Sequence, residues 1–253
     1  FVSREYQPSQ RCGGMGSFYT DLSKELCRLG HQVTVLCASD DTEQERIEVN
    51  EGISVHRLPG GDFCIAGIEG QATLARLRSW FRQSSRYTAY RKRVACEIDK
   101  LIENKCCDVV VCSEYGAETI AWAENKRATP LVVKCSGPTY LDRAVGRSAQ
   151  FNFMQFPLKK IADDEYRLLC KADAIFAPSK AMADFVKKDV GLQKEICVIP
   201  NFIRFDEWAI SFPKEIKNRI FFAGTVNAGK GAFDLVTAVK ILRAQGLNLT
   251  LRM

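Results

Sequence analysis

Short apolar runs rich in β-branched residues alternate with segments of helical periodicity along most of the chain. The runs predict strands at residues 32–37, 53–58, 108–113, 131–135, 174–177 and 196–199. Apolar residues that recur at helical spacing predict helices at residues 18–29, 117–125, 158–171 and 181–188. Strands that alternate with helices form a mainly parallel sheet with helices on both faces. We therefore expect an α/β fold with a Rossmann-like sheet.

The pattern breaks after Asn201 and starts again at Arg219. Residues 202–217 contain bulky aromatics and Pro213 with little periodicity, and the next segments predict a strand at 219–224, a helix at 232–245 and a strand at 247–252. We expect an N-terminal domain at 1–205, a linker at 206–217 and the beginning of a second Rossmann-like domain at 218–253. A unit of roughly 35 residues buries too little apolar surface to fold alone. Because the first residue is Phe1 rather than Met, and because the second domain is incomplete, we expect truncation at both ends.

Composition places the chain among ordinary globular proteins, with 46% hydrophobic and 26% charged residues in 253. Its apolar runs are far shorter than the roughly 20 residues of a membrane span. The 11 cysteines form no C-x-x-C pair, and we expect them to be reduced and mostly buried, as in a cytoplasmic protein. With only two histidines, we expect no metal site. The net charge of +6 fits an anionic partner without choosing among nucleic acid, lipid headgroup and phosphorylated substrate.

A glycine-rich loop, Cys12-Gly-Gly-Met-Gly16, leads into the first predicted helix. Small residues let backbone N–H groups approach an anion, and a helix N-terminus adds a partial positive charge, so the loop can bind phosphate. The alternative is that the glycines only let helix and sheet pack closely. A dinucleotide fingerprint is disfavoured, since a long loop separates Ser3 from Gly13. We expect this loop and those at 114–116 and 136–138 to meet at the carboxyl edge of the sheet.

Residues 71–104 predict one long or broken helix with an uneven distribution of charge. At 100° per residue, Arg78, Arg82, Arg86 and Arg93 fall on one side. The other side carries mainly Leu77, Trp80, Tyr87, Val94 and Ile98. Such a helix can lie on an anionic membrane, or it can pack on its own domain with a solvated arginine face. Both interpretations stay open at this point.

Several of these stretches together resemble the retaining glycosyltransferases of family 4, which have the GT-B fold. The matching segments are Ser3–Tyr6 with Gly13–Gly16, and then residues 29–35, 172–179, 198–201 and 222–231. The resemblance implies two facing Rossmann-like domains, the first holding the acceptor and the second a nucleotide-sugar. It also implies hexosyl transfer from a UDP- or GDP-sugar to a sugar or lipid-linked acceptor, with no cofactor, no metal and no nucleic acid. The expected location is the cytoplasm, with peripheral attachment to the inner face of a membrane as an option.

The resemblance also assigns site residues. It implies that the donor phosphates bind to the backbone of Gly14 and Gly16 and to the side chains of Thr225 and Lys230. Fixed donors there would stabilise the charge that builds on the leaving diphosphate. The expected catalytic pair is Ser136 and Glu114, and Gly13 and Tyr115 are expected on the acceptor side.

Two departures from the family pattern change the expected chemistry. Thr225 stands where many members have arginine, and Ser136 stands where relatives often have histidine. A glutamate pair that grips the donor in relatives would lie beyond Met253, so we expect this polypeptide alone to be inactive. Two other functions stay open: a nucleotide-sugar epimerase of the same fold, and a non-catalytic module that binds sugar or lipid.

Overall fold

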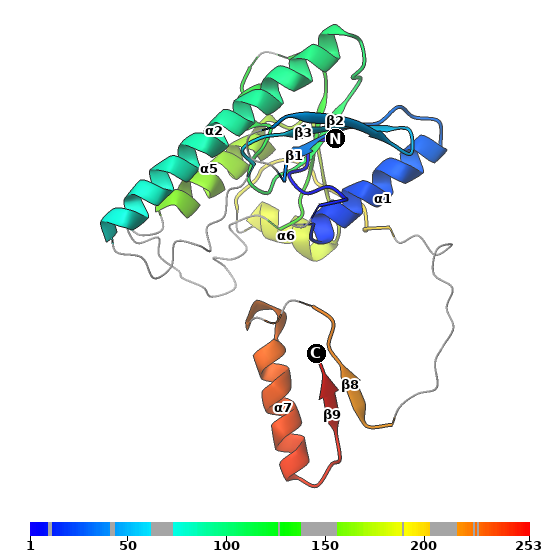
Figure 1. Ribbon diagram of the computed structural model, residues 1–253, viewed down its shortest axis with the longest axis vertical. Coiled ribbons are helices and arrows are strands. Elements are labelled where there is room, and N and C mark those ends of the chain that lie inside the picture. Colours follow the sequence, from blue (N-terminus) through cyan, green and yellow to red (C-terminus); the bar gives the residue numbers. More distant parts are fainter. Residues whose placement is uncertain are drawn as a thin grey trace. The chain divides into compact units, whose positions relative to one another are not determined.

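The computed structural model of the protein describes residues 1–9, 12–40, 44–61, 73–125, 127–137, 156–188, 190–202, 217–224, 226 and 228–253. The chain divides into two units, Phe1–Ile203 and Arg204–Met253, and each is described by itself (Figure 1). Both units combine helices with parallel strands, so the α/β class expected from the alternating pattern is confirmed.

One sheet runs through the first unit. Its strands are β1 (Thr34–Ala38), β2 (Arg46–Asn50), β3 (Ile53–Leu58), β4 (Val110–Ser113), β5 (Leu131–Lys134), β6 (Ala174–Ala177) and β7 (Cys197–Val198). The start of the chain joins its two halves, because Val2 bridges Leu36 of β1 and Cys112 of β4 in parallel. The resulting order is β2, β3, β1, Val2, β4, β5, β6, β7, and every pairing except that of β2 is parallel.

The antiparallel strand β2 was not predicted from the sequence. It pairs with β3 across a two-residue turn in which Glu51 and Gly52 have φ of 50° and 80°. Two successive residues with positive φ are typical of the hairpin turn that matches the twist of the strands. Its signal was present in the alternation of Ile47 and Val49 with polar residues, followed by a glycine turn.

Five helices of the first unit are described: α1 (Gly14–Arg28), α2 (Thr73–Glu103), α3 (Ile120–Ala123), α5 (Phe156–Lys171) and α6 (Lys180–Lys188). Side chains alternate between the two faces of a strand, and the core divides accordingly. Val35 and Cys37 of β1 pack in a cluster with Tyr19 of α1. Leu36, between them, packs in a second cluster with Tyr90 of α2. Helices α1 and α2 therefore cover opposite faces of the sheet.

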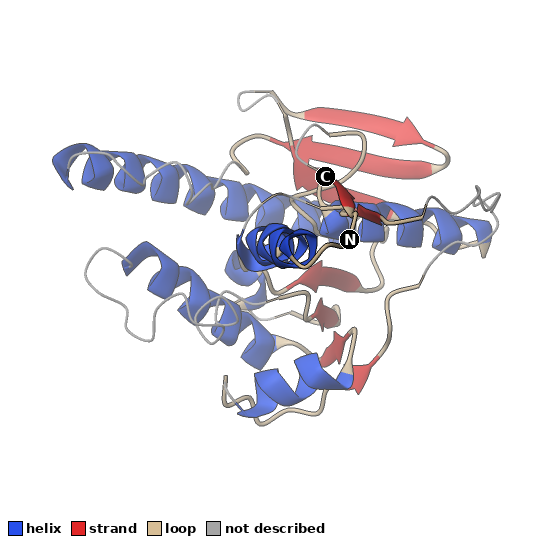
Figure 2. Ribbon diagram, turned by 90° about the horizontal axis from the view of Figure 1, so that it is seen from below, coloured by secondary structure: helices blue, strands red, loops and turns tan. Residues whose placement is uncertain are grey.

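Helix α2 is a single element of 31 residues, about 46 Å long at 1.5 Å per residue. Figure 2 shows its N-terminal part extending past the strands of the sheet. Tyr87, Val94 and Ile98 are buried, whereas Arg78, Arg82 and Arg86 are exposed. For these side chains the predicted division into an apolar and a basic side is confirmed. The side chains of Leu77 and Trp80 are not among those that the structure describes.

The second unit contains β8 (Arg219–Phe221), the short 3-10 helix η4 (Ala228–Lys230), α7 (Ala232–Ala244) and β9 (Thr250–Arg252). Strands β8 and β9 pair in parallel, as expected for a β-α-β unit. Both strands are shorter than the sequence pattern predicted.

Two further expectations concern the cysteines and the membrane. The expectation that the cysteines are mostly buried was wrong: Cys37, Cys112 and Cys135 are buried, but Cys96, Cys106, Cys170 and Cys197 are exposed. All ten described cysteines are free thiols. None of the described helices has the length and apolar character needed to cross a membrane.

Candidate functional site

The candidate site lies where the chain changes direction in the sheet. The first residues, around Val2, lie between β1 and β4, so the chain proceeds to one side of this segment first and to the other side later. In open α/β sheets, ligands bind beyond the carboxyl ends of the strands at such a switch point. Arg4, Glu5 and the glycine loop follow this segment, and the loops after β4 and β5 emerge at the same edge.

The glycine loop forms the N-terminus of α1. Gly13 is the N-cap residue, and its N–H donates a hydrogen bond to Oε2 of Glu5 over 2.8 Å. A Cβ atom on Gly16 would lie 2.3 Å from Sγ of Cys12 and 3.2 Å from the main-chain carbon of Glu5. Around Gly14 there is open space, with no atom within 4 Å of such a Cβ. Close packing therefore accounts for Gly16, but not for Gly14.

Helix α1 begins at Gly14, four residues before the predicted start at Phe18. Gly14 and Gly16 consequently belong to the first helical turn rather than to a loop that precedes it. The first N–H groups of a helix have no partner within the helix, so this position keeps the ability to bind an anion.

Glu114 ties the loops after β4 and β5 together. Its carboxylate is fully buried and accepts hydrogen bonds from the N–H of Ser136 at 2.7 and 2.8 Å and of Gly137 at 2.7 Å. The hydroxyl of Ser113 also donates to it, over 3.0 Å. Burial raises the pKa of Glu114, and the hydrogen bonds from Gly137 and Ser136 oppose that shift. The geometry makes Glu114 a positioning residue for Ser136, and a role in the chemistry itself stays a prediction.

Lys134, at the end of β5, connects this loop pair to α1. Its side chain is buried, its Nζ donates to Oγ of Ser136 over 3.2 Å, and the ammonium lies 4.4 Å from the ring centroid of Phe18. Burial lowers the pKa of Lys134, while the charge of Glu114 acts in the opposite direction. Sequence reasoning missed this residue because it lies within an apolar run. Its signal was a lysine at the next-to-last position of the strand predicted at residues 131–135.

The hydrogen bond from Lys134 fixes what Ser136 can do. An ammonium group only donates, so Oγ of Ser136 accepts that bond and its own proton is left to donate to another acceptor. The arrangement suits contact with an oxygen atom of a ligand.

Tyr115 lies beside the start of the chain. The guanidinium of Arg4 is 5.4 Å from the centroid of the Tyr115 ring. The backbone N–H of Arg4 and the hydroxyl of Tyr90 each donate to the buried carboxylate of Glu118, both over 2.8 Å. The aromatic ring of Tyr115 is thereby placed near the switch point.

The next residue, Gly116, is held by two helices. Its carbonyl accepts hydrogen bonds from the hydroxyl of Tyr87 at 2.8 Å and from Nη2 of Arg91 at 2.5 Å, both on α2. Its N–H donates to Oε1 of Glu165 on α5 over 2.9 Å. With φ of 77°, this position favours glycine, and an added Cβ would lie 2.5 Å from the Tyr87 hydroxyl. The loop after β4 is therefore firmly placed.

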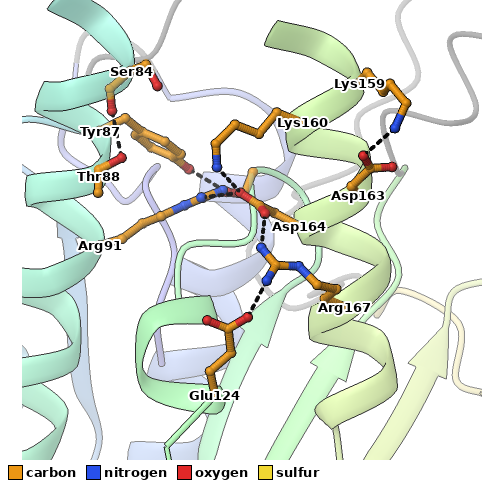
Figure 3. Close-up of polar contacts among 11 residues, drawn as sticks. Ser84, Tyr87, Thr88, Arg91, Glu124, Lys159, Lys160, Asp163, Asp164 and Arg167 are labelled. Carbon is orange, nitrogen blue, oxygen red and sulfur yellow. Dashed lines mark hydrogen bonds and ion pairs between the residues drawn. The ribbon is translucent and has the colours of Figure 1, made fainter. Parts of the chain in front are cut away.

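The same arginine makes a buried ion pair between α2 and α5 (Figure 3). Nη1 of Arg91 lies 2.6 Å from Oδ2 of Asp164, and both side chains are buried. Asp164 forms two further ion pairs, one with Arg167 and one with Lys160 at 3.6 Å. Arg167 in turn pairs with Glu124 at 2.5 Å. Burial alone would raise the pKa of Asp164, but hydrogen bonds from Arg91 and Arg167 lower it below its usual value. This cluster holds together the helices that support the Gly116 loop.

Lys230 and Thr225 belong to the second unit. Lys230 is exposed at the end of η4 and precedes Gly231, the left-handed N-cap of α7, with φ of 71°. Thr225 lies outside the described residues. The expected phosphate role of both residues stays a prediction.

Among the residues that the structure describes, no three His, Cys, Asp or Glu side chains are grouped so that they could hold a metal ion. The first unit thus brings together Gly13, Gly14, Glu114, Tyr115 and Ser136 at one edge of the sheet, and it adds Lys134, which the sequence did not indicate.

Comparison with known families gives a direct assignment. The sequence profile of Glycosyltransferase Family 4 matches residues 12–207, which include most of the first unit. The chain belongs to glycosyltransferase family 4. No individual curated protein is significantly similar to it. For a member of this family, the residues gathered at the switch point are candidates for contact with the sugar donor and the acceptor.

Proposed function

We propose that the protein transfers a hexose, with retention of configuration, from a UDP- or GDP-sugar to a sugar or lipid-linked acceptor. The reaction would take place on the cytoplasmic side, within a GT-B arrangement, and without a metal ion. The observation that supports this best is the N-terminus of α1, placed at the switch point within the part of the chain that matches the family.

The phosphate chemistry follows from α1. This helix has 15 residues, and its first amides, from Gly14 onward, point toward the carboxyl edge of the sheet. When the bond between sugar and diphosphate breaks, negative charge builds on the phosphate oxygens. Backbone donors fixed before the reaction stabilise that charge in the transition state.

The catalytic pair, Ser136 and Glu114, and the acceptor-side residue Tyr115 belong to the two loops that Glu114 joins. Ser136 has a hydroxyl proton that Lys134 leaves free to donate to a ligand oxygen, and Tyr115 offers an aromatic face of the kind that sugars pack against. In the second unit, Lys230 and Thr225 would contact donor phosphates.

The first test is a panel of UDP- and GDP-sugars, each incubated with the complete protein containing this chain. Binding is scored by thermal shift, and transfer or hydrolysis by release of the nucleoside diphosphate. We expect one donor to raise the melting temperature and to be consumed. A donor that binds without being consumed with any sugar or lipid-linked acceptor would favour the non-catalytic module, and no binding by any member would contradict the proposal.

A pair of glycine variants separates the phosphate role from the packing role. Gly14→Ala is expected to keep or raise stability by up to about 1 kcal/mol, because alanine favours a helix and its Cβ meets open space. The same variant should lower kcat/KM about 10- to 100-fold, since it weakens one hydrogen bond to a charged group. Gly16→Ala should instead lower the free energy of unfolding by about 1–3 kcal/mol, because Cys12 can turn away but the main chain of Glu5 cannot. Unchanged kcat/KM in Gly14→Ala would show that no phosphate approaches this residue.

A further inference from the structure

Positive charge is concentrated in the N-terminal part of α2. Residues 73–93 contain seven arginines and lysines and no acidic residue. The whole chain has 36 basic and 30 acidic residues, so the other 232 residues contain 29 basic and 30 acidic ones. The net charge of +6 therefore arises entirely from this one stretch of helix.

The charge is displayed on one side of the helix. Arg78, Arg82 and Arg86 follow each other at intervals of four residues and are all exposed. Other basic residues of the segment serve the fold: Arg91 pairs with Asp164, and Nη1 of Arg93 donates to the carbonyl of Pro59 over 3.1 Å. The core is formed by the opposite side of α2. The three exposed arginines thus form a basic stripe that packing does not explain.

A groove borders this stripe between α2 and α5. It has a volume of about 560 Å³ and is lined by Phe81, Ser84, Ser85, Thr88, Ala89 and Lys92 of α2, and by Lys160 of α5. Figure 3 shows Ser84 and Thr88 on α2 and Lys160 on the facing helix. The ring of Phe81 is 62% exposed. The groove therefore combines an aromatic ring, hydroxyls and two ammonium groups.

We propose that this face of α2 docks on a membrane that contains anionic phospholipid. The helix lies along the surface, where the basic stripe and Lys92 contact lipid phosphates, and the exposed part of the Phe81 ring enters the acyl boundary beside the groove. A phospholipid supplies both phosphate and an apolar chain, and so matches the cations and the aromatic groove together. A nucleic acid matches mainly the cations. Docking is independent of sugar transfer, so it can be tested without a donor or an acceptor.

The test is co-sedimentation of the 253-residue chain with vesicles of phosphatidylcholine, alone or mixed with phosphatidylglycerol. We expect binding to the mixed vesicles only, weakening as salt is added. Arg82→Gln/Arg86→Gln should lower the partition coefficient about 30-fold, because each arginine near an anionic surface contributes about fivefold. Phe81→Ser should weaken binding as well, and the binding that it retains should be lost completely at high salt.

The matched control is Lys187→Gln/Lys188→Gln, which removes the same charge from the exposed end of α6. It should bind nearly as the unaltered chain does. All variants change exposed side chains, so thermal unfolding is expected to stay unchanged, and Arg78→Gln/Arg82→Gln replaces any variant that unfolds early. Equal losses in the α2 and α6 variants, equal binding to phosphatidylcholine alone, or tighter binding to a single-stranded oligonucleotide at the same salt concentration would each overturn the proposal.

Discussion

Replacing Asp164 with alanine is expected to lower the free energy of unfolding by about 3–5 kcal/mol. The variant leaves the guanidinium of Arg91 buried without its carboxylate, and an uncompensated buried charge is strongly destabilising. For a domain of this size, the melting temperature should fall by roughly 6–20 °C. Thermal unfolding followed by circular dichroism measures the effect.

The neighbouring residue provides the control. Asp163 also pairs with a lysine on α5, Lys159, at 2.6 Å, but both side chains are about half exposed. Exposed ion pairs contribute about 0–1 kcal/mol, so the melting temperature of Asp163→Ala should stay close to that of the unaltered protein. The double variant Arg91→Met/Asp164→Leu should recover much of the stability lost in Asp164→Ala, since apolar side chains can replace a buried pair. Equal losses for the two single aspartate variants would contradict the role assigned to the buried pair.

The lowered pKa of Asp164 gives this stabilisation a defined pH dependence. A carboxyl group whose pKa is lower in the folded state stabilises the fold above its ordinary value of 3.8. The contribution is lost as the pH falls through the folded pKa. The stability difference between the unaltered protein and Asp164→Ala should therefore shrink in acid.

Replacing Lys230 with methionine is expected to lower kcat about 10²- to 10³-fold in the complete protein. This is the usual loss when one fixed donor to developing negative charge is removed. The reason lies in the leaving group: an ammonium on the diphosphate matters more as the sugar bond breaks than in the ground state. Steady-state kinetics with the donor selected by the panel measures the effect.

Lys240 on α7 supplies a matched control for this measurement. It is another exposed lysine of the second unit, and Lys240→Met makes the same chemical change ten residues further along the chain. Its kcat should stay near that of the unaltered protein. If Lys230→Met raised KM alone and left kcat unchanged, the ammonium would bind the donor without stabilising the transition state.

Much of the first unit could be predicted from the sequence, because its strands are continuous apolar runs. Such runs arise when both faces of a parallel strand are buried, and all six predicted strand positions contain strands. Strand β2 was not predicted because it lies at the edge of the sheet, where Ile47 and Val49 are exposed and the apolar pattern is weak. The start of α1 was placed late because glycines disfavour a helix interior, whereas here they occupy its first turn.

The candidate site was harder to predict, since its contacts join residues that are distant in sequence. The loops containing Glu114 and Ser136 were expected at one edge of the sheet. Nothing in the sequence shows, however, that the Glu114 carboxylate accepts hydrogen bonds from backbone amides. Lys134 was missed because a lysine is rarely buried, and only the folded chain shows that its ammonium lies against the distant ring of Phe18 as well as the hydroxyl of Ser136.

The bond pattern at Glu114 has a consequence for attempts to redesign this enzyme. The Glu114 carboxylate, in the turn after β4, accepts hydrogen bonds from two backbone amides of the turn after β5. The conformation of each turn therefore depends on the other. A chimera that imports only one turn from a relative would leave a buried charge or two amides unmatched. Both turns would have to be transplanted together for a new sugar preference to come with a folded protein.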